Sequence, residues 1–385
     1  MRIKRFALSL IFACIAGGFA FSQTQSPPAS SAASAPSGHF ESDDFLGLEG
    51  PGLVYSEVQP GPGVLRAGLL SDYHAPLRGT AFDTPVFFLG GNDAVREKSS
   101  RESPASRAGP ACLVLAGSHA NEIAGVLAAY WLIEHCHVEG AKLVVLPRGN
   151  TSAATHSAQN AQKPRVIMLG DAAVRYGFRL SNPRHETVPD PLQFIPPRAA
   201  PALAPLAGRE MRNLNRQFPG SEHGSMTAQT AFAIMQLLSQ ENITVAFDLH
   251  EAGSASSLAW SIITRPEYMD DAALAALELE ETAGTTFHLE SSREAFAGYS
   301  HWEWGMEGIR AYLIETFNPA QPNDDPSVDQ LHHPVSPLAR RVFVHLKAVQ
   351  AILSAIEDQG AGTVPHMKGL PQTIEEVQAW LEGSE

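Results

Sequence analysis

Between residues 84 and 316, short apolar runs alternate with segments whose apolar residues recur every three or four positions. The runs have the length and composition of buried strands, and they span residues 84–90, 112–116, 143–146, 244–249 and 311–316. Helical patterns lie around residues 123–131, 227–239, 270–282 and 338–356. Strands that alternate with helices usually pair in parallel and are covered on both faces. The sequence therefore predicts an α/β fold whose mixed, mostly parallel sheet is flanked by helices.

Two other segments bear on the domain organisation. Residues 151–208 are rich in Pro, Ala and Arg without a clear period, so we expect an irregular excursion that borders the functional site. After the helical pattern ends at residue 356, only a short amphipathic piece at 373–381 follows. That remainder is too small for another domain, so we expect a single folded domain over residues 45–385.

The first 44 residues read as a targeting segment and a tether. Basic residues Arg2, Lys4 and Arg5 precede an apolar run and then small residues, which is the pattern of a signal peptide over residues 1–23. A membrane anchor is the alternative, but the apolar run is shorter than the roughly 20 residues that cross a bilayer. Residues 24–44 are mostly Ser, Ala and Pro and predict a flexible linker. We therefore expect a periplasmic or secreted protein with no integral membrane segment after signal removal.

Charge and cysteine content limit the possible partners and metal ligands. The chain has 27 Lys and Arg against 41 Asp and Glu, a formal charge of -14, which disfavours nucleic acid as a partner. Its three cysteines, Cys14, Cys112 and Cys136, exclude a disulfide scaffold, so a metal would need His and carboxylate ligands. Lipid attachment at Cys14 is a weaker alternative to signal cleavage. Cys112 and Cys136 could form a bridge, but two buried reduced thiols are the favoured alternative.

Two polar clusters follow predicted strands. His119 and Glu122 stand three residues apart after the run 112–116, at the strand end where open α/β sheets place ligands. Alone, this pair is a weak signal, and the alternative is a capped helix start with a solvated Glu122. His250 ends the run TVAFDLH, and Asp248 points to the same side, where it could accept the second ring proton of His250. A lone strand-end histidine is more often a satisfied core or surface residue, so the case depends on the two clusters together.

Two further clusters supply arginines and a buried carboxylate. Arg209, Arg212 and Arg216 lie within one loop of an otherwise acidic chain, and arginine is suited to forked recognition of a carboxylate. Surface salt bridges are the alternative for these arginines. Glu315 stands near the end of the apolar run 311–316, which favours a buried carboxyl group with a raised, functional pKa.

Four motifs occur together in an order that resembles the zinc carboxypeptidases, and most closely the branch that contains succinylglutamate desuccinylase and aspartoacylase. They are HANE at 119–122, NLNRQFPG at 213–220, DLHEA at 248–252 and LIETF at 313–317. The similarity spans residues 85–318. The chain departs from the family at Ala120 and Asn121, where Gly and Asp are frequent. After residue 356 we expect no counterpart of the C-terminal β domain of aspartoacylase-like enzymes.

The resemblance implies a zinc carboxypeptidase-like catalytic domain with one zinc ion. It implies His119, Glu122 and His250 as the metal ligands, which is also the composition expected of an open catalytic zinc site. The resemblance also implies that Glu315 is the general base and that Arg209, or nearby Arg212, stabilises the oxyanion. It further implies that Asn215 and Arg216 bind the substrate carboxylate. Tyr299 is a candidate for a residue that closes over the substrate. The alternative is that Tyr299 only lines the pocket.

The predicted function is a zinc-dependent hydrolase that cleaves an amide bond near a free carboxylate, acting on a peptide or an N-acyl amino acid. Zinc would polarise the carbonyl group and acidify a water molecule, and Glu315 would transfer its proton. A metallocarboxypeptidase and an N-acyl amino acid deacylase both fit. A non-catalytic peptide-binding protein of the same fold is the alternative, and the intact Glu315 argues against it. A structural envelope protein with incidental His and Glu residues is a third possibility.

Overall fold

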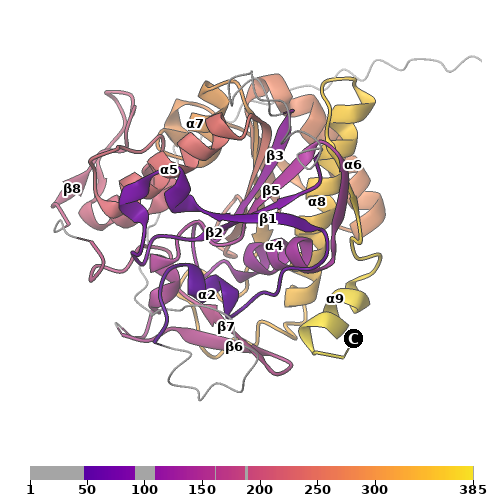
Figure 1. Cartoon of the computed structure of the whole chain (residues 1–385), viewed down its shortest axis with the longest axis horizontal. Helices are drawn as coiled ribbons and strands as arrows, with labels where there is room; N and C mark the ends of the chain where they lie inside the picture. The colour runs from indigo at the N-terminus through magenta and orange to yellow at the C-terminus, as the bar shows by residue number, and fades with distance from the viewer. Residues whose placement is uncertain (1–46, 92–108, 161, 187–189, 385) are drawn as a thin grey trace, which may run out of the picture.

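The computed structural model describes residues 47–91, 109–160, 162–186 and 190–384. The predicted signal peptide, the linker and Cys14 lie outside these residues. The central feature is an eight-stranded sheet (Figure 1). Its strands run in the order β1 (Val64–Leu69), β2 (Pro85–Leu89), β5 (Lys142–Leu146), β3 (Ala111–Ala116), β10 (Ile243–Ala252), β13 (Arg310–Phe317), β11 (Ser261–Thr264) and β12 (His288–Ser291).

The middle of this sheet is parallel and its margins are antiparallel. Strands β5, β3, β10 and β13 pair in parallel, whereas β1 and β2 on one side and β11 on the other are antiparallel to their inner neighbours. Each of the five apolar runs expected to be strands lies in this sheet. The mixed, mostly parallel sheet predicted from the sequence is confirmed.

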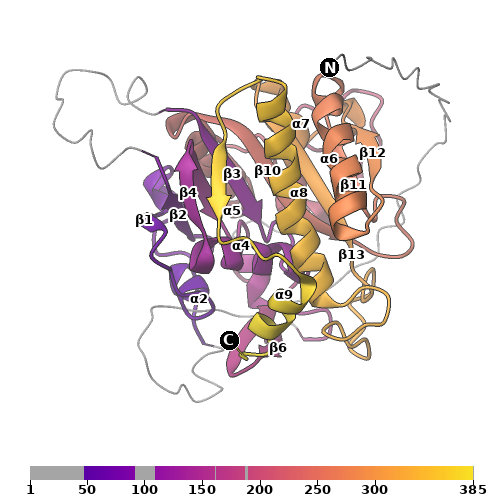
Figure 2. The ribbon, with the colours of Figure 1, turned by 90° about the vertical axis from the view of Figure 1, so that its right-hand side faces the viewer.

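Helices cover both faces, and strand β3 shows how. Cys112, Val114 and Ala116 pack in one apolar core with helices α4 (Ile123–His135), α6 (Met269–Ala283) and α8 (Leu338–Asp358). The alternate residues Ala111, Leu113 and Leu115 pack in a second core with α5 (Met226–Gln240) and with Trp304 of α7 (Ser300–Met306). Burying a Leu or Val side chain contributes about 1.5–3 kcal/mol, so both faces of β3 stabilise the sheet. Figure 2 shows α6 and α8 side by side in front of it.

The remaining elements surround this three-layer body. Helix α2 (Pro51–Tyr55) precedes the sheet, and α9 (Ile374–Leu381) packs on α8. Two-stranded ladders join β4 (His137–Gly140) to β14 (Pro365–Lys368), β6 (Arg165–Leu169) to β7 (Ala172–Tyr176), and β8 (Gln193–Phe194) to β9 (Leu206–Ala207). Short 3₁₀ turns are η1 (Leu70–Asp72), η2 (Ala75–Leu77), η4 (Ser152–Thr155), η5 (Gly208–Arg212), η6 (Leu214–Arg216), η7 (Pro266–Tyr268) and η8 (Glu294–Phe296).

Three expectations can be compared with these elements. The excursion at 151–208 is less irregular than expected, because two of the ladders form within or at the end of it. Cys112 and Cys136 are buried free thiols, in agreement with the favoured alternative to a disulfide. Among the described helices, none combines the length and the apolar character needed to span a membrane.

Candidate metal centre and active site

Three neighbouring parallel strands bring the predicted site residues to one end of the sheet. His119 and Glu122 follow β3, His250 lies near the C-terminal end of β10, and Glu315 lies near that of β13. In the ladder between β10 and β13, His250 pairs with Glu315. In parallel strands, paired residues face the same side of the sheet, so these two side chains project together.

The turn that carries His119 is held tightly against its surroundings. Gly117 has a φ of 64°, and a Cβ there would lie 3.0 Å from the Cα of Arg148, so a side chain would be strained and crowded. Ala120 exchanges two backbone hydrogen bonds with the excursion, donating to the carbonyl of Phe178 at 2.7 Å and accepting from the amide of Gly177 at 3.0 Å. These contacts fix the path of the chain between the two candidate ligands.

His119, Glu122 and His250 form one buried cluster. Their side chains could each offer one ligand atom, and these atoms lie within 4.8 Å of one another. The residues are 3%, 4% and 1% exposed. The carboxylate of Glu122 lies between the rings, with Oε1 2.8 Å from Nδ1 of His119 and Oε2 2.6 Å from Nδ1 of His250. Glu122 stands at the N-cap of α4 but makes no capping bond with its side chain, so the solvated-cap interpretation does not hold.

The other nitrogen of each ring has its own acceptor. Nε2 of His250 lies 3.0 Å from Oδ2 of Asp248, the contact that the spacing in the sequence predicts. Nε2 of His119 lies 2.9 Å from Oδ1 of Asn213. Asp248 is itself held by the hydroxyls of Ser118 and Ser300, which donate to it at 3.0 and 2.5 Å. When the proton of each ring lies on Nε2, the Nδ1 lone pairs face Glu122, which is the arrangement that second-shell partners give to metal-binding histidines.

The chemistry of these donors fits a divalent cation. Two imidazole nitrogens and a carboxylate oxygen have lone pairs turned toward the same place, so a proton or a cation must lie among them. Burial lowers the pKa of His119 to about 4, which favours its neutral, ligating form. Burial also opposes a charge on His250, but the carboxylates of Asp248 and Glu122 raise the pKa of His250 well above its usual value. Positive charge is therefore favoured in this cluster, and two His with one Glu is a donor set of catalytic zinc sites.

Glu315 lies beside this cluster in an environment that raises its pKa toward neutrality. Its Oε2 atom is buried and has no hydrogen-bond partner among the described residues. Burial, followed by the negative charge of Glu122, raises the pKa of Glu315 to about 8. A carboxyl group with a pKa near neutrality is suited to accept and return a proton.

Asn215 and Arg216 also lie beside the candidate ligands. Nδ2 of Asn215 is 3.2 Å from Nε2 of His250, and Oδ1 of Asn215 accepts a hydrogen bond from the amide of Ser300 at 2.8 Å. The guanidinium of Arg216 is buried and lies 3.8 Å from the centre of the Tyr299 ring. The structure thus brings together Asn215, Arg216 and Tyr299, which the sequence pattern groups with the substrate.

Arg209 and Arg212 have other surroundings. Arg209 is partly exposed, and burial lowers its pKa. The charges that act most strongly on this pKa are those of Glu210, Arg212, Arg179 and Asp190. Arg212 binds the carboxylate of Asp190 at 3.0 Å and donates to the carbonyl of Ser181. The oxyanion-stabilising role suggested for Arg209 or Arg212 stays a prediction from the sequence.

Arg179 is a further arginine whose charge acts on the cluster, and no motif in the sequence includes it. Its guanidinium lies 4.0 Å from Glu210, and Arg179 is 28% exposed. Although burial opposes its charge, Glu210, Glu122, Tyr299 and Glu315 together raise the pKa of Arg179. It stands directly after the two residues that pair with Ala120, so it enters the site through the excursion. The expectation that the excursion borders the site was the one available signal.

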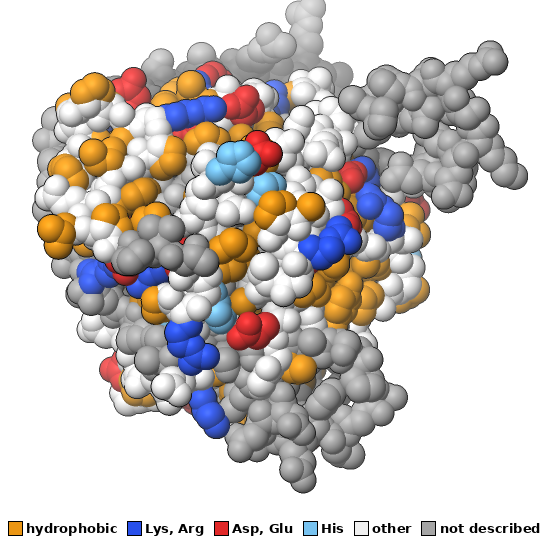
Figure 3. All heavy atoms as spheres, turned by 60° about the vertical axis from the view of Figure 1, so that its left-hand side comes forward, with side chains coloured by type: hydrophobic (Ala, Val, Ile, Leu, Met, Phe, Trp, Pro, Cys, Tyr) orange, Lys and Arg blue, Asp and Glu red, His pale blue; other side chains and the backbone are white. Residues whose placement is uncertain are grey.

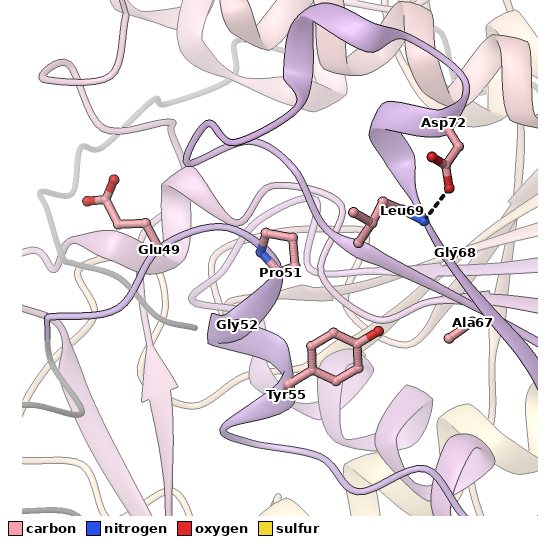
Figure 4. Close-up of a pocket in the computed structure, with 8 residues that line it drawn as sticks. All are labelled: Glu49, Pro51, Gly52, Tyr55, Ala67, Gly68, Leu69 and Asp72. Atoms are coloured by element: carbon pink, nitrogen blue, oxygen red, sulfur yellow. Dashed lines mark hydrogen bonds between the residues drawn. The ribbon is translucent and has the colours of Figure 1, made fainter. Parts of the chain in front are cut away.

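Other surface features do not coincide with this cluster. A hollow between α2 and β1 is lined by Tyr55, Leu69 and Asp72, and Figure 4 shows Asp72 accepting a bond from the amide of Leu69, at 2.9 Å. None of the predicted site residues lines it. Leu192 and Ile195, beside β8, are strongly exposed. Figure 3, which views the molecule from that side, shows hydrophobic side chains scattered among charged and polar ones.

Comparison with known proteins gave distant structural similarities. No family model and no curated protein matches the chain. The tripeptide-bound cell shape determinant Csd4 of Helicobacter pylori is 15% identical, with a TM-score of 0.42 over 73% of this chain and 57% of Csd4. A metallo-carboxypeptidase of Burkholderia cenocepacia is 10% identical, with a TM-score of 0.45 over 77% and 66% of the two chains. A succinylglutamate desuccinylase/aspartoacylase of Rhodobacter sphaeroides is 17% identical, with a TM-score of 0.39 over 71% and 59%.

The chain spans less than two thirds of the length of each of these three proteins. They include members of both groups that the four sequence motifs resemble, a carboxypeptidase and a desuccinylase/aspartoacylase. Because the similarities are distant, the chemistry of the site is derived from its own residues.

Proposed function

We propose that this chain is a zinc-dependent hydrolase that cleaves an amide bond near a free carboxylate. The observation that carries the proposal is the buried cluster of His119, Glu122 and His250, whose ligand atoms lie within 4.8 Å of one another. Glu315, with an unpartnered Oε2 and a raised pKa, stands beside this cluster. A metal centre next to a carboxyl group that can accept a proton is the minimum machinery for water-mediated hydrolysis.

Each residue has a role that follows from its surroundings. His119, Glu122 and His250 would hold the ion, which when bound supplies Lewis-acid polarisation of the carbonyl group and acidifies water. Glu315 takes a proton from the attacking water at its buried Oε2 and delivers it to the leaving amine. Arg179 supplies positive charge where the carbonyl oxygen becomes negative, which is the role that the sequence pattern gave to Arg209 or Arg212.

Arg216 and Asn215 select the substrate. A guanidinium group binds a carboxylate through two parallel hydrogen bonds, which fixes orientation as well as charge. A substrate with a free carboxylate next to the scissile amide would be held there, so a peptide C-terminus and an N-acyl amino acid both qualify. The predicted signal peptide favours extracellular or periplasmic substrates. We assign the catalytic domain to residues 45–385.

The proposal is tested by metal analysis and a substrate panel. The mature protein should contain about one zinc per chain, as expected of a single three-ligand site. The panel consists of dipeptides, muropeptide fragments and N-acyl amino acids, each offered as the free acid and as the carboxamide. Hydrolysis restricted to free acids would support the proposal. A zinc-loaded protein that binds these compounds without cleaving any of them would favour the non-catalytic alternative, and a protein without bound metal would overturn the proposal.

A further inference from the structure

A hydrogen-bonded chain of three side chains leads away from the candidate metal centre. Oδ1 of Asn213 accepts from Nε2 of His119 at 2.9 Å, and Nδ2 of Asn213 donates to Oε2 of Glu210 at 2.7 Å. Glu210 and Asn213 are 3% and 0% exposed. Glu210 lies in η5, and Asn213 is the residue between η5 and η6.

The direction of this chain is fixed at both ends of the amide. Oδ1 of Asn213 also accepts the backbone N–H of Asn215 at 3.1 Å, and a backbone N–H can only donate. The Nδ2 atom must therefore face Glu210, whose carboxylate only accepts. With an oxygen acceptor at its Nε2, His119 carries its proton on that nitrogen, and Nδ1 keeps a lone pair toward Glu122.

Glu210 brings a negative charge to the outer end of this chain. Its burial would favour the neutral acid, but the guanidinium groups of Arg179 and Arg216 and the bond from Asn213 lower the pKa of Glu210 below its usual value. An ionised acceptor makes a stronger hydrogen bond than a neutral one, and successive bonds in a chain polarise one another. His250 receives this support directly from Asp248, whereas His119 is backed by a neutral amide.

We propose that Glu210 is a positioning residue of the metal centre, which acts through the amide of Asn213 to hold His119 with Nδ1 toward the metal. The inference rests on the proposed metal-dependent function. Glu210 also lies 4.0 Å from Arg179, so one carboxylate connects a metal ligand with the arginine assigned to the carbonyl oxygen. Partners of metal-binding histidines contribute about 10–100-fold to metal affinity or activity.

The test measures zinc affinity by competition with a chromophoric chelator, so it does not depend on hydrolysis. The full-length mature protein is compared with Glu210→Ala, Asn213→Ala and the double variant. Each single substitution should weaken zinc binding by about 10–100-fold. If Glu210 acts through Asn213, the double variant should bind zinc as Asn213→Ala does, because the path from Glu210 to His119 is already broken. Glu210→Gln, which keeps an oxygen acceptor for Asn213, should lose less affinity than Glu210→Ala and guards against misfolding of the alanine variant.

Glu186→Ala is the matched control. Glu186 accepts hydrogen bonds from the amides of Met226 and Thr227 at the start of α5, so its loss should lower stability and leave zinc affinity unchanged. The positioning role would be overturned if both Glu210 variants bound zinc as tightly as wild type. It would also be overturned if the double variant lost affinity by the product of the two single losses. Either result would leave the proposed function standing. A wild-type chain that binds no zinc would overturn the proposed function together with the positioning role.

Discussion

His250 and Glu315 occupy the same level of adjacent parallel strands, paired in the register of β10 and β13. A shift of one residue in that register would turn Glu315 to the opposite face of the sheet. The separation between a candidate ligand and the candidate base is thus set by backbone hydrogen bonds rather than by a loop. Both side chains come from rigid elements, which is the arrangement expected where a proton must be transferred over a fixed distance.

Replacing the base should separate metal binding from catalysis. Glu315→Gln keeps the size of the side chain but cannot accept a proton, so hydrolysis should fall by about 10²–10⁴-fold. Zinc content should remain at the wild-type level, because the three ligand residues are untouched. Metal analysis and initial rates on the best substrate of the panel check both points. The exposed Glu139, replaced by Gln, serves as the control and should change neither. Loss of zinc from Glu315→Gln would mean that Glu315 is a ligand.

The raised pKa of Glu315 predicts a pH-dependent difference in stability. In the metal-free protein, folding raises the pKa of Glu315 from 4.5 to about 8. The folded state therefore holds more protons between these values, and stability from this group is lost as the pH rises through about 8. Glu315→Gln cannot ionise, so this variant should gain stability relative to wild type as the pH rises through this window. Urea unfolding of the chelator-treated proteins measures the difference. A difference that does not vary with pH would contradict the assigned pKa.

Metal removal should destabilise the fold through the same cluster. Zinc that binds the folded state alone stabilises it by about 2.7 kcal/mol when free zinc is a hundred times Kd. Chelator treatment of the wild type should thus lower the thermal midpoint, and added zinc should restore it. His250→Ala should show no response to either treatment, because a ligand is missing. An equal response of wild type and His250→Ala to zinc would show that the metal binds elsewhere.

The oxyanion-stabilising role is given to Arg209 by the sequence pattern and to Arg179 by the proposal from the structure. Arg179→Ala should lower hydrolysis by about 10²–10³-fold with zinc retained, as loss of an oxyanion donor does. Arg209→Ala should have little effect, because Arg209 is partly exposed and the largest charge acting on it is its neighbour Glu210. The two variants are compared by kcat and KM on one substrate. A large loss of kcat in Arg209→Ala and none in Arg179→Ala would restore the assignment made from the sequence.

The sequence predicts the parts of this site that local patterns encode. His119 and Glu122 follow a buried strand in one turn, and His250 ends another, so strand patterns alone place them at the same end of a parallel sheet. The predicted strands and helices agree with the structure because each buries apolar side chains with a regular period. The short strands β6 and β14, outside the main sheet, bury few side chains and were not predicted.

Arg179, Glu210 and Asn213 could not be identified in this way. Arg179 reaches the site because Gly177 and Phe178 bond to the backbone of Ala120, more than fifty residues earlier in the chain. Such backbone pairing leaves no mark in side-chain periodicity. Glu210 is buried by its contacts with Asn213 and Arg179. In the sequence, nothing distinguishes it from a solvent-exposed acidic residue of a loop.

Gly125 is a point of close contact between α4, which begins after Glu122, and the strand that carries His250. A Cβ at Gly125 would lie 2.8 Å from both Cβ and O of Leu249, so a methyl group would push the helix from β10. In an isolated helix Gly125→Ala would stabilise by about 0.5–1 kcal/mol, but overpacking against backbone costs about 1–3 kcal/mol and should decide the sign.

Gly125→Ala should therefore lower the free energy of unfolding and also weaken zinc binding, since moving α4 moves Glu122 relative to His250. Gly362→Ala is the matched control, because a Cβ there would meet only Cγ2 of Ile356 at 4.0 Å. Denaturant unfolding and chelator competition measure the two effects. If Gly125→Ala matched the control in both, the packing of α4 on β10 would not be what holds Glu122 and His250 together.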